Sequence, residues 1–258
     1  MKIWCQSASA IGTNQVWKPY EEALQRHLQR IARPGTMVDL HGVKVWSPAV
    51  SWLRYAEYLN ASEIIDNALE AEKRGYDAFV VFCMDDPAFY ELRQTVNIPL
   101  VSAGETAFHM ACLLAPKFAI LSYNVAPLRH QMENAKRYGL GERLVSGGAF
   151  GITLSDVVQG FTKPEPILKG VREVSKKAFE QGAAILVPSC GILNMILVEN
   201  KIREVETIPI LDVVGTALKV AELLVELKAL GVERSNLGSY ARVSSDELSA
   251  LRKAYRVE

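Results

Sequence analysis

Two cysteines stand at equivalent points of the sequence, each just after a short apolar run. Cys83 ends the stretch DAFVVFC (residues 77–83), and Cys190 ends the stretch AAILVPSC (residues 183–190). Apolar runs of this length are typical of buried strands in parallel sheets. A thiol exchanges protons readily once its pKa approaches neutrality. We therefore begin from the hypothesis that the two thiols form one acid–base pair.

The chain repeats itself around these cysteines. Cys190 lies 107 positions after Cys83, and at this shift EIIDNALEAEKRGYDAFVVFC aligns without a gap on GVREVSKKAFEQGAAILVPSC, with Gly75 on Gly182. Further on, NIPLVSAGETAFHMA (from residue 97) aligns on TIPILDVVGTALKVA (from residue 207) at a shift of 110. The opening KIWCQS resembles KFAILS at residues 117–122. Three matches in the same order indicate two similar halves.

Each half alternates short apolar runs with helical patterns, which predicts a mainly parallel sheet covered by helices. Strands are predicted at 2–5, 36–41, 78–82 and 100–101, and again at 118–121, 143–146, 185–188 and 210–211. Helices are predicted at about 61–74, capped by Asn60 with Glu63 in a capping-box position, at 165–181, at about 193–205 and from near 214. We expect one α/β domain at 1–116 plus 212–258, because the C-terminal helix packs back, and a second at 117–211.

The predicted surroundings of the thiols favour their ionisation. Both cysteines should lie beyond the carboxyl ends of strands, where open parallel sheets bind ligands. Asp85-Asp86-Pro87 is typical of a helix start after Cys83, and Gly191 permits a close turn into the helix after Cys190. Free amides there favour a thiolate, so we expect thiol pKa values lowered toward neutrality. If the halves face each other about a pseudo-two-fold axis, a thiolate and a thiol on opposite sides of a carbon could racemise it without metal or cofactor.

The other candidates have structural explanations. Cys5 ends the first strand without a cysteine counterpart in the repeat, and Cys112 lies within a helical run, so both are predicted to be structural. Asp85 and Asp86 could form a carboxylate pair, although helix capping accounts for at least one of them. Glu105 could contact substrate or cap the helix that follows, and the sequence leaves this open.

Composition excludes several classes of function. Twenty-nine basic residues balance twenty-nine acidic ones, which gives no electrostatic case for nucleic acid or a membrane surface as partner. No uncharged apolar run approaches the ~20 residues that span a bilayer. The start MKIWCQSASA reads as a strand rather than a secretory signal, and four cysteines without framework spacing favour reduced thiols and a cytoplasmic protein. The absence of CxxC and the scattered histidines argue against a zinc site.

The residues around both thiols resemble the aspartate/glutamate/hydantoin racemase superfamily, most of all its hydantoin and allantoin racemase branch. CMDDPAF (residues 83–89) and IPLVSAGETAF (98–108) are similar to its first cysteine motif and the segment that follows. PSCGIL (188–193) and IPILDVVGTALKVAE (208–222) are similar to its second cysteine turn and closing segment. The resemblance covers nearly the whole chain. It implies two Rossmann-like domains, an active site in the cleft between them, and racemisation by two cysteines without a cofactor.

The chain departs from this pattern at positions that should border the cleft. Gln6-Ser7-Ala8 replaces the Asn-Pro-Asn-like turn of hydantoin-type members, and Ser122-Tyr123 replaces a Thr-Thr-like pair. Met84-Asp85 and Gly191-Ile192 stand where racemases of carboxylate amino acids have Asn-Thr and Thr-His, which disfavours free glutamate or aspartate. The residues predicted to contact substrate are Gln6, Ser7, Met84, Ser122, Tyr123, Gly191 and Ile192. The aromatic stretch around Trp46, Trp52 and Tyr55 could pack in the core or wall the pocket.

The sequence thus predicts a racemase of a five-membered cyclic ureide or similar amide, such as a 5-substituted hydantoin or an allantoin-like compound, with Cys83 and Cys190 as opposed bases. We expect no cofactor or metal, a small-molecule substrate and a homo-oligomer. A decarboxylase or cis–trans isomerase of the same superfamily is the alternative enzyme. A non-catalytic binding protein with the same bilobed fold is the alternative of another class.

Overall fold

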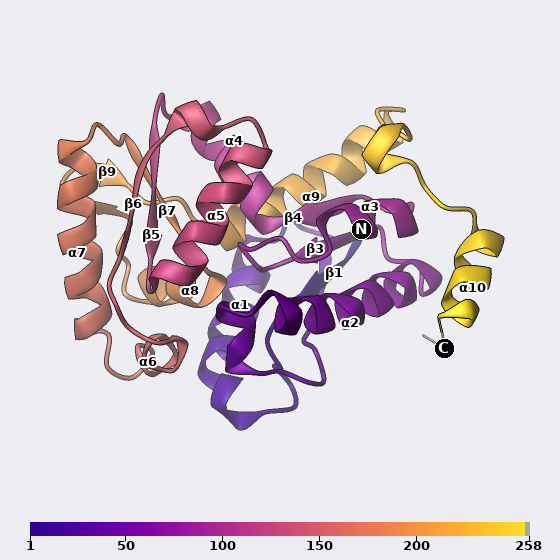
Figure 1. The fold of residues 1–258 in the computed structure, drawn as a ribbon, viewed down its shortest axis with the longest axis horizontal. Coiled ribbons are helices and arrows are strands. Elements are labelled where there is room, and N and C mark those ends of the chain that lie inside the picture. Colours follow the sequence, from indigo (N-terminus) through magenta and orange to yellow (C-terminus); the bar gives the residue numbers. More distant parts are fainter. Residues whose placement is uncertain (256–258) are drawn as a thin grey trace.

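The computed structural model describes residues 1–255, and its fold is α/β with two separate parallel sheets (Figure 1). The first sheet has the order β2-β1-β3-β4, with strands β1 Lys2–Gln6, β2 Met37–His41, β3 Ala78–Val81 and β4 Leu100–Ser102. The second has the order β6-β5-β7, with β5 Phe118–Ser122, β6 Leu144–Ala149 and β7 Ile185–Pro188. In both sheets the first strand of the half lies between the second and the third. The predicted duplication is therefore confirmed at the level of sheet topology.

Helices cover both sheets. In the second half α5 and α7 both contact β5 and β6, and Figure 1 shows them on opposite sides of the sheet. In the first half α1 contacts β2, and α2 contacts β3. The helices are α1 Lys18–Ile31, α2 Arg54–Lys73, α3 Phe89–Thr95, α4 Ala103–Leu114, α5 Val125–Arg137, α6 Leu154–Gln159, α7 Glu165–Glu180, α8 Gly191–Glu199, α9 Val213–Ala229 and α10 Ser245–Ala254. Short 3₁₀ helices form at η1 Gln15–Trp17, η2 Pro48–Ser51, η3 Gly141–Arg143 and η4 Gly238–Tyr240.

The ends of α2 and α7 repeat the same turn. Gly75 and Gly182 have φ values of +71° and +86°, a left-handed conformation that favours glycine. The next amide closes each helix: Tyr76 N–H donates to the carbonyl of Ala71, and Ala183 N–H donates to that of Ala178. The predicted C-terminal caps are confirmed.

The predicted start of α2 is wrong. The helix begins at Arg54, so Asn60 lies inside it and donates from its side chain to the carbonyl oxygen of Ala8 (3.2 Å). Glu63 forms no capping box; its carboxylate instead accepts the backbone N–H of Lys44 at 2.6 Å. Tertiary partners therefore replace the local cap.

Three further boundaries differ from the sequence prediction. The helix after Cys190 ends at Glu199, and a short antiparallel hairpin of β8 Glu204–Val205 and β9 Ile208–Pro209 follows. The predicted strand at 210–211 is reduced to one bridge between Ile210 and Leu186. No helix starts directly after Cys83: residues 84–88 form turns, with Asp86 and Ala88 at positive φ, and α3 begins only at Phe89.

The long helix α9 connects the second sheet back to the first. It follows the segment paired with β7 and packs on β3, β4 and α4 (Figure 1). This is the contact expected of a C-terminal segment that belongs to the first domain. We propose the division at 1–116 plus 212–258 and 117–211 on this basis. Within residues 1–255 no helix has both the length and the apolarity to cross a membrane.

Candidate active site

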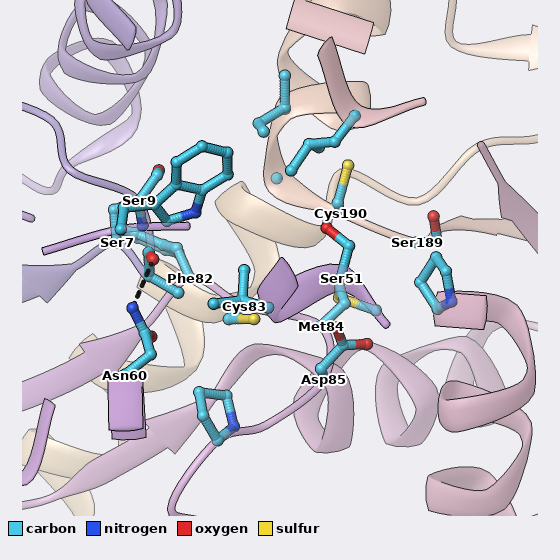
Figure 2. Close-up of a pocket in the computed structure, with 18 of the residues that line it drawn as sticks. Ser7, Ser9, Ser51, Asn60, Phe82, Cys83, Met84, Asp85, Ser189 and Cys190 are labelled. Carbon is cyan, nitrogen blue, oxygen red and sulfur yellow. Dashed lines mark hydrogen bonds between the residues drawn. The ribbon is translucent and has the colours of Figure 1, made fainter. Parts of the chain in front are cut away.

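Cys83 and Cys190 line the same cleft, to which the two halves of the chain both contribute (Figure 2). Cys83 follows β3 and Cys190 follows β7, which are corresponding strands of the repeat. The cleft has an empty volume of about 690 Å³. The pairing of the two thiols in one cavity is the main feature that the repeat predicted.

Cys190 is the N-cap of α8. Its backbone is extended (φ −156°, ψ 156°), and its Sγ accepts a hydrogen bond from the backbone N–H of Leu193 at 3.3 Å. The amide of Ile192 also bonds to this sulfur. Gly191 allows the close approach of α1, because a Cβ atom there would lie 2.7 Å from the hydroxyl oxygen of Tyr20. The predicted helix N-terminus beside the second thiol is confirmed.

Cys83 has a different setting, since a turn rather than a helix follows it. The amide of Asp85 bonds to its sulfur, and the amide of Asp86 donates to its carbonyl oxygen at 3.2 Å. Asp86 points away from the cleft: its carboxylate accepts the N–H groups of Gly104 and Glu105, both at 2.7 Å, and so caps α4. Glu105 pairs with Arg93 and does not line the cleft. Capping, rather than substrate contact, is therefore the structural use of Asp86.

The expected lowering of the thiol pKa values is wrong. Burial raises the pKa of Cys190 to about 12, although the amides of Leu193 and Ile192 act in the opposite direction. Burial and then the charge of Asp85 raise the pKa of Cys83 well above its usual value. The physical reason is that a thiolate loses more by leaving water than one or two amide hydrogen bonds return. Burial thus favours the neutral form of both thiols.

Five of the predicted substrate-contact residues line the cleft: Ser7, Met84, Tyr123, Gly191 and Ile192. Gln6 and Ser122 do not. The side chain of Gln6 is wholly buried and bonded to Trp4 and Asn67. The hydroxyl of Ser122 donates to the carbonyl oxygen of Asn124 at 2.9 Å. For these two residues the prediction is wrong, because both side chains are held inside the protein.

Tyr123 closes one side of the cleft together with a segment from the other half. The segment 46–54, here called the strap, contributes Trp46, Val50 and Ser51 to the lining. Ser51 forms a hydrogen bond with the hydroxyl of Tyr123. Trp46 also packs edge-on against Trp17, with ring centroids 4.7 Å apart. The aromatic stretch thus both packs and walls the pocket, whereas Trp52 and Tyr55 are exposed.

Several lining residues were not predicted at all. Sequence patterns gave no signal for the serines of the cleft beyond Ser7, or for Trp17 and Tyr20 meeting there. These side chains come from loops and helix ends that only tertiary packing brings together. The unpredicted lining residues are Ser9, Trp17, Tyr20, Val50, Ser51, Glu57, Asn60, Phe82, Pro87, Pro127, Leu154 and Ser189.

The charged side chains that line the cleft are acidic. Among the described residues that line it, Glu57 and Asp85 carry carboxyl groups, and none is lysine, arginine or histidine. Cys5 and Cys112, predicted to be structural, lie elsewhere: Cys5 is wholly buried in β1, and Cys112 lies on α4. Within residues 1–255 no group of three His, Cys, Asp or Glu side chains is placed to hold a metal ion.

Comparison with known proteins shows the family to which the chain belongs. The family model for Asp/Glu/hydantoin racemases matches residues 18–221. The chain therefore belongs to the Asp/Glu/hydantoin racemase family and is an isomerase of the racemase type.

Individual relatives cover most of the chain. It is 27% identical over 225 residues to a hydantoin racemase of Pseudomonas sp. (strain NS671), which spans 84% of this chain and 86% of that protein. It is 28% identical over 225 residues to a hydantoin racemase of Paenarthrobacter aurescens, spanning 86% and 91%. The crystal structure of an allantoin racemase from Pseudomonas fluorescens shares the fold, with a TM-score of 0.79, 22% identity and coverage of 94% and 97%.

Proposed function

We propose that the protein is a cofactor-independent racemase of a cyclic ureide or amide, either a 5-substituted hydantoin or an allantoin-like compound. The observation that carries the proposal is the presence of Cys83 and Cys190 in one cleft, at corresponding ends of duplicated strands. The named relatives, hydantoin racemases by sequence and an allantoin racemase by fold, support this substrate class.

The proposed reaction is a two-base proton exchange. One cysteine acts as a thiolate and takes the proton from the stereocentre, while the C–H electron pair moves into the adjacent carbonyl to give an enolate-like intermediate. The opposite thiol then donates its proton to the other face, and the electron pair returns to carbon. The pair ends with its protonation states exchanged, so it can run the reverse reaction directly. Because both steps are proton transfers between sulfur and carbon, they require no metal or cofactor.

The rest of the cleft suits a neutral ring with polar edges. Hydroxyl groups of Ser7, Ser51 and Tyr123 line it and can bond to ring carbonyl and N–H groups. The indoles of Trp17 and Trp46 offer an apolar wall for a ring substituent. A free amino-acid carboxylate would find no cationic side chain among the described lining residues, and two carboxyl groups would oppose it. We therefore propose a ureide rather than glutamate or aspartate as substrate.

The test is to replace each cysteine and to measure racemisation of a panel of substrates by the variants. Cys83→Ser and Cys190→Ser should each lower racemisation of the active hydantoin by at least ~1000-fold, since serine is a far weaker acid and base than cysteine. Cys112→Ser, on α4 outside the cleft, is the matched control and should keep full activity. Loss of optical rotation is followed for hydantoins, allantoin and amino acids.

The alternatives give different results in the same assays. A racemase exchanges deuterium from heavy water into the stereocentre without loss of carbon, whereas a decarboxylase releases carbon dioxide. A cis–trans isomerase would leave optical rotation unchanged, and a binding protein would turn over no member of the panel. Full activity in either active-site cysteine variant would refute the two-base mechanism. We also propose a cytoplasmic homo-oligomer, which light scattering of the purified protein would test.

A further inference from the structure

A second groove lies between α4 and α9, the two helices that pack against each other beside the first sheet (Figure 1). It is also lined by residues 97–100 before and at the start of β4, and by the segment 232–242 after α9. Its empty volume is about 1470 Å³, against about 690 Å³ for the thiol cleft, and the two share no lining residue. We call it the α4–α9 groove.

The sequence gives this groove an apolar floor. The lining residues recur at positions 106, 109, 110 and 113 on α4 and at 220, 223, 224 and 227 on α9, so each helix contributes one face. Most of these side chains are apolar, and Leu113 and Leu223 are 79% and 44% exposed. The core uses other residues of the same helices, such as the wholly buried Phe108 and Leu218. This face is therefore left over from the packing of the core.

Basic side chains line the groove beside the apolar floor, namely Arg93, Lys228, Arg234 and Arg242. Arg93 is paired with Glu105. Within residues 1–255 the other three form no ion pair with a carboxylate. The second acidic lining residue, Glu233, is exposed. The groove thus has an excess of positive charge that its own residues do not neutralise.

Hydrogen bonds fix two of the unpaired cations at the groove. Lys228 Nζ donates to the carbonyl oxygen of Asn97 at 3.4 Å, and Arg234 Nη2 donates to the carbonyl oxygen of Val96 at 2.9 Å. The Nε of Arg234 is buried and has no hydrogen-bond partner among the described residues. Since the carbonyl acceptors are neutral, these bonds hold the cations in position without compensating their charge.

The cations of the groove also repel one another. Burial, and then the charges of Arg242 and Arg93, lower the pKa of Arg234. Arg93 belongs to the same group in space, because its guanidinium lies 5.2 Å from the centroid of the Tyr240 ring, on the segment that carries Arg234 and Arg242. An anion bound among these side chains would replace repulsion by attraction.

The charge of the groove favours a small anionic ligand over a second copy of the chain. In a two-fold symmetric contact the same patch lies on both sides of the axis, so the unpaired cations of one copy would oppose those of the other. A concave, mostly apolar surface with a few charged groups is instead typical of a small-molecule site. Arginine binds carboxylates with two parallel hydrogen bonds.

We propose that the α4–α9 groove is a second ligand site, separate from the thiol cleft, for a small carboxylate with an apolar body. The carboxylate pairs with Arg234 and Arg242, and the apolar body lies along the floor against Leu223. The site does not take part in the proposed racemisation.

The test is calorimetric titration with octanoate and with octan-1-ol, which have the same hydrocarbon chain but differ in charge. The wild type should bind octanoate at least ~10-fold more tightly than octan-1-ol, because hydrogen bonds between ionised groups are stronger than neutral ones. In Arg234→Gln/Arg242→Gln the affinity for octanoate should fall at least ~10-fold. The affinity for octan-1-ol should stay the same, which shows that the groove of this variant is intact.

Further variants test the floor and keep the test valid if the double arginine variant does not fold. Leu223→Asn should weaken both ligands, whereas Leu230→Asn, 79% exposed and outside the groove, should weaken neither. Lys228→Gln changes an exposed side chain and should weaken octanoate alone, by about threefold. Cys83→Ser/Cys190→Ser should bind octanoate as the wild type does, since the cleft and the groove share no residue.

The contrary outcomes are distinct. The proposal is overturned if octanoate shows no saturable binding below its micelle concentration, or if octanoate and octan-1-ol bind equally well. A preference for octanoate that survives in Arg234→Gln/Arg242→Gln would also overturn it, as would loss of octanoate binding in the double cysteine variant. If octanoate does not bind and Leu223→Asn dissociates an oligomer in light scattering, the groove is a contact between copies. None of these titrations involves turnover, so failure of the racemase proposal would leave their outcome unchanged.

Discussion

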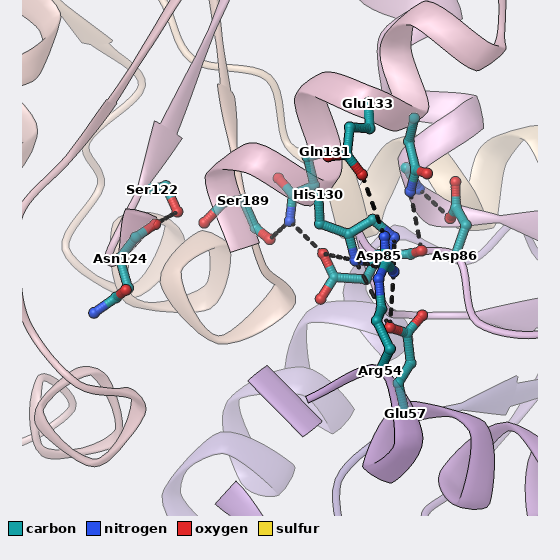
Figure 3. Close-up of polar contacts among 12 residues, drawn as sticks. Arg54, Glu57, Asp85, Asp86, Ser122, Asn124, His130, Gln131, Glu133 and Ser189 are labelled. Carbon is teal, nitrogen blue, oxygen red and sulfur yellow. Dashed lines mark hydrogen bonds and ion pairs between the residues drawn. The ribbon is translucent and has the colours of Figure 1, made fainter. Parts of the chain in front are cut away.

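Gln131 links the two thiol loops directly with one side chain (Figure 3), so its replacement tests whether the relative position of the loops matters. Its Nε2 donates to Asp85 Oδ1 at 2.9 Å and to the carbonyl oxygen of Ser189 at 2.7 Å, and it is wholly buried. Gln131→Met keeps the length and flexibility of the side chain but removes both hydrogen bonds. It leaves a partly buried carboxylate oxygen of Asp85 and the buried carbonyl oxygen of Ser189 without this donor.

The expected cost follows from those two bonds. An unsatisfied buried polar group costs about 1–3 kcal/mol, so the loss of both bonds in Gln131→Met should lower the free energy of unfolding by about 2–6 kcal/mol. A protein in the upper part of the ordinary range of about 5–15 kcal/mol then stays mostly folded at room temperature. Any further loss of activity then reflects displacement of the thiols. A shift on the order of 1 Å in a catalytic group lowers rates by about 100-fold, so kcat/KM should fall at least tenfold.

The measurement is denaturant unfolding together with racemisation at a concentration of denaturant far below the transition. Gln94→Met is the matched control, because the amide of Gln94 makes an exposed hydrogen bond to the carbonyl oxygen of Ser239 at 3.3 Å. That variant should change stability by less than about 1 kcal/mol and leave activity intact. A Gln131→Met protein with the stability and activity of the control would refute the view that α5 sets the geometry of the thiol pair.

Two further predictions test the cleft and the strap. Gly191→Ala should lower kcat/KM at least tenfold, because the added Cβ would lie 2.7 Å from the hydroxyl oxygen of Tyr20. Adding Tyr20→Phe to this variant should restore part of the lost activity, and equal activity in the single and double variants would contradict the clash. His130 has its folded pKa lowered to about 4 by burial and then by Arg54 and Arg137, so the stability it contributes is present above its unfolded value of 6.5 and is lost as pH falls toward 4. His130 contacts Arg54, at the end of the strap. The rate of proteolysis of the strap in the wild type should therefore increase as pH falls from 6.5 to 4. In His130→Gln this rate should depend less on pH.

The features predicted well from the sequence are those carried by local pattern and by the repeat. Short apolar runs gave β1, β3, β5 and β7 to within one residue, since buried parallel strands have few alternatives. Gly75 and Gly182 marked the ends of α2 and α7, because a left-handed cap favours glycine over other residues. The repeat, finally, placed Cys83 and Cys190 at corresponding strand ends, which is why both thiols could be assigned to one cleft.

The features predicted poorly depend on contacts between distant segments. Asp86 has the local signature of an N-cap, yet its carboxylate caps α4, which starts seventeen residues later, at Ala103. Gln6 lies at the end of β1, where the repeat suggests a cleft residue, but Trp4 and Asn67 hold its side chain in the interior. Neither hydrophobic periodicity nor secondary-structure propensity predicts these hydrogen-bond partners, because they come from segments that are distant in the sequence.

The thiol pKa values show why an amide-rich turn alone does not make a thiolate. The sequence shows the helix start that supplies amides to Cys190, but not the burial of the same sulfur. Desolvation outweighs these amides, so burial raises the pKa of Cys190 to about 12 although a helix N-terminus lies beside it. Duplication supplied two alike sulfur sites, whereas an acid at residue 85 opposite an isoleucine at 192 makes them unlike.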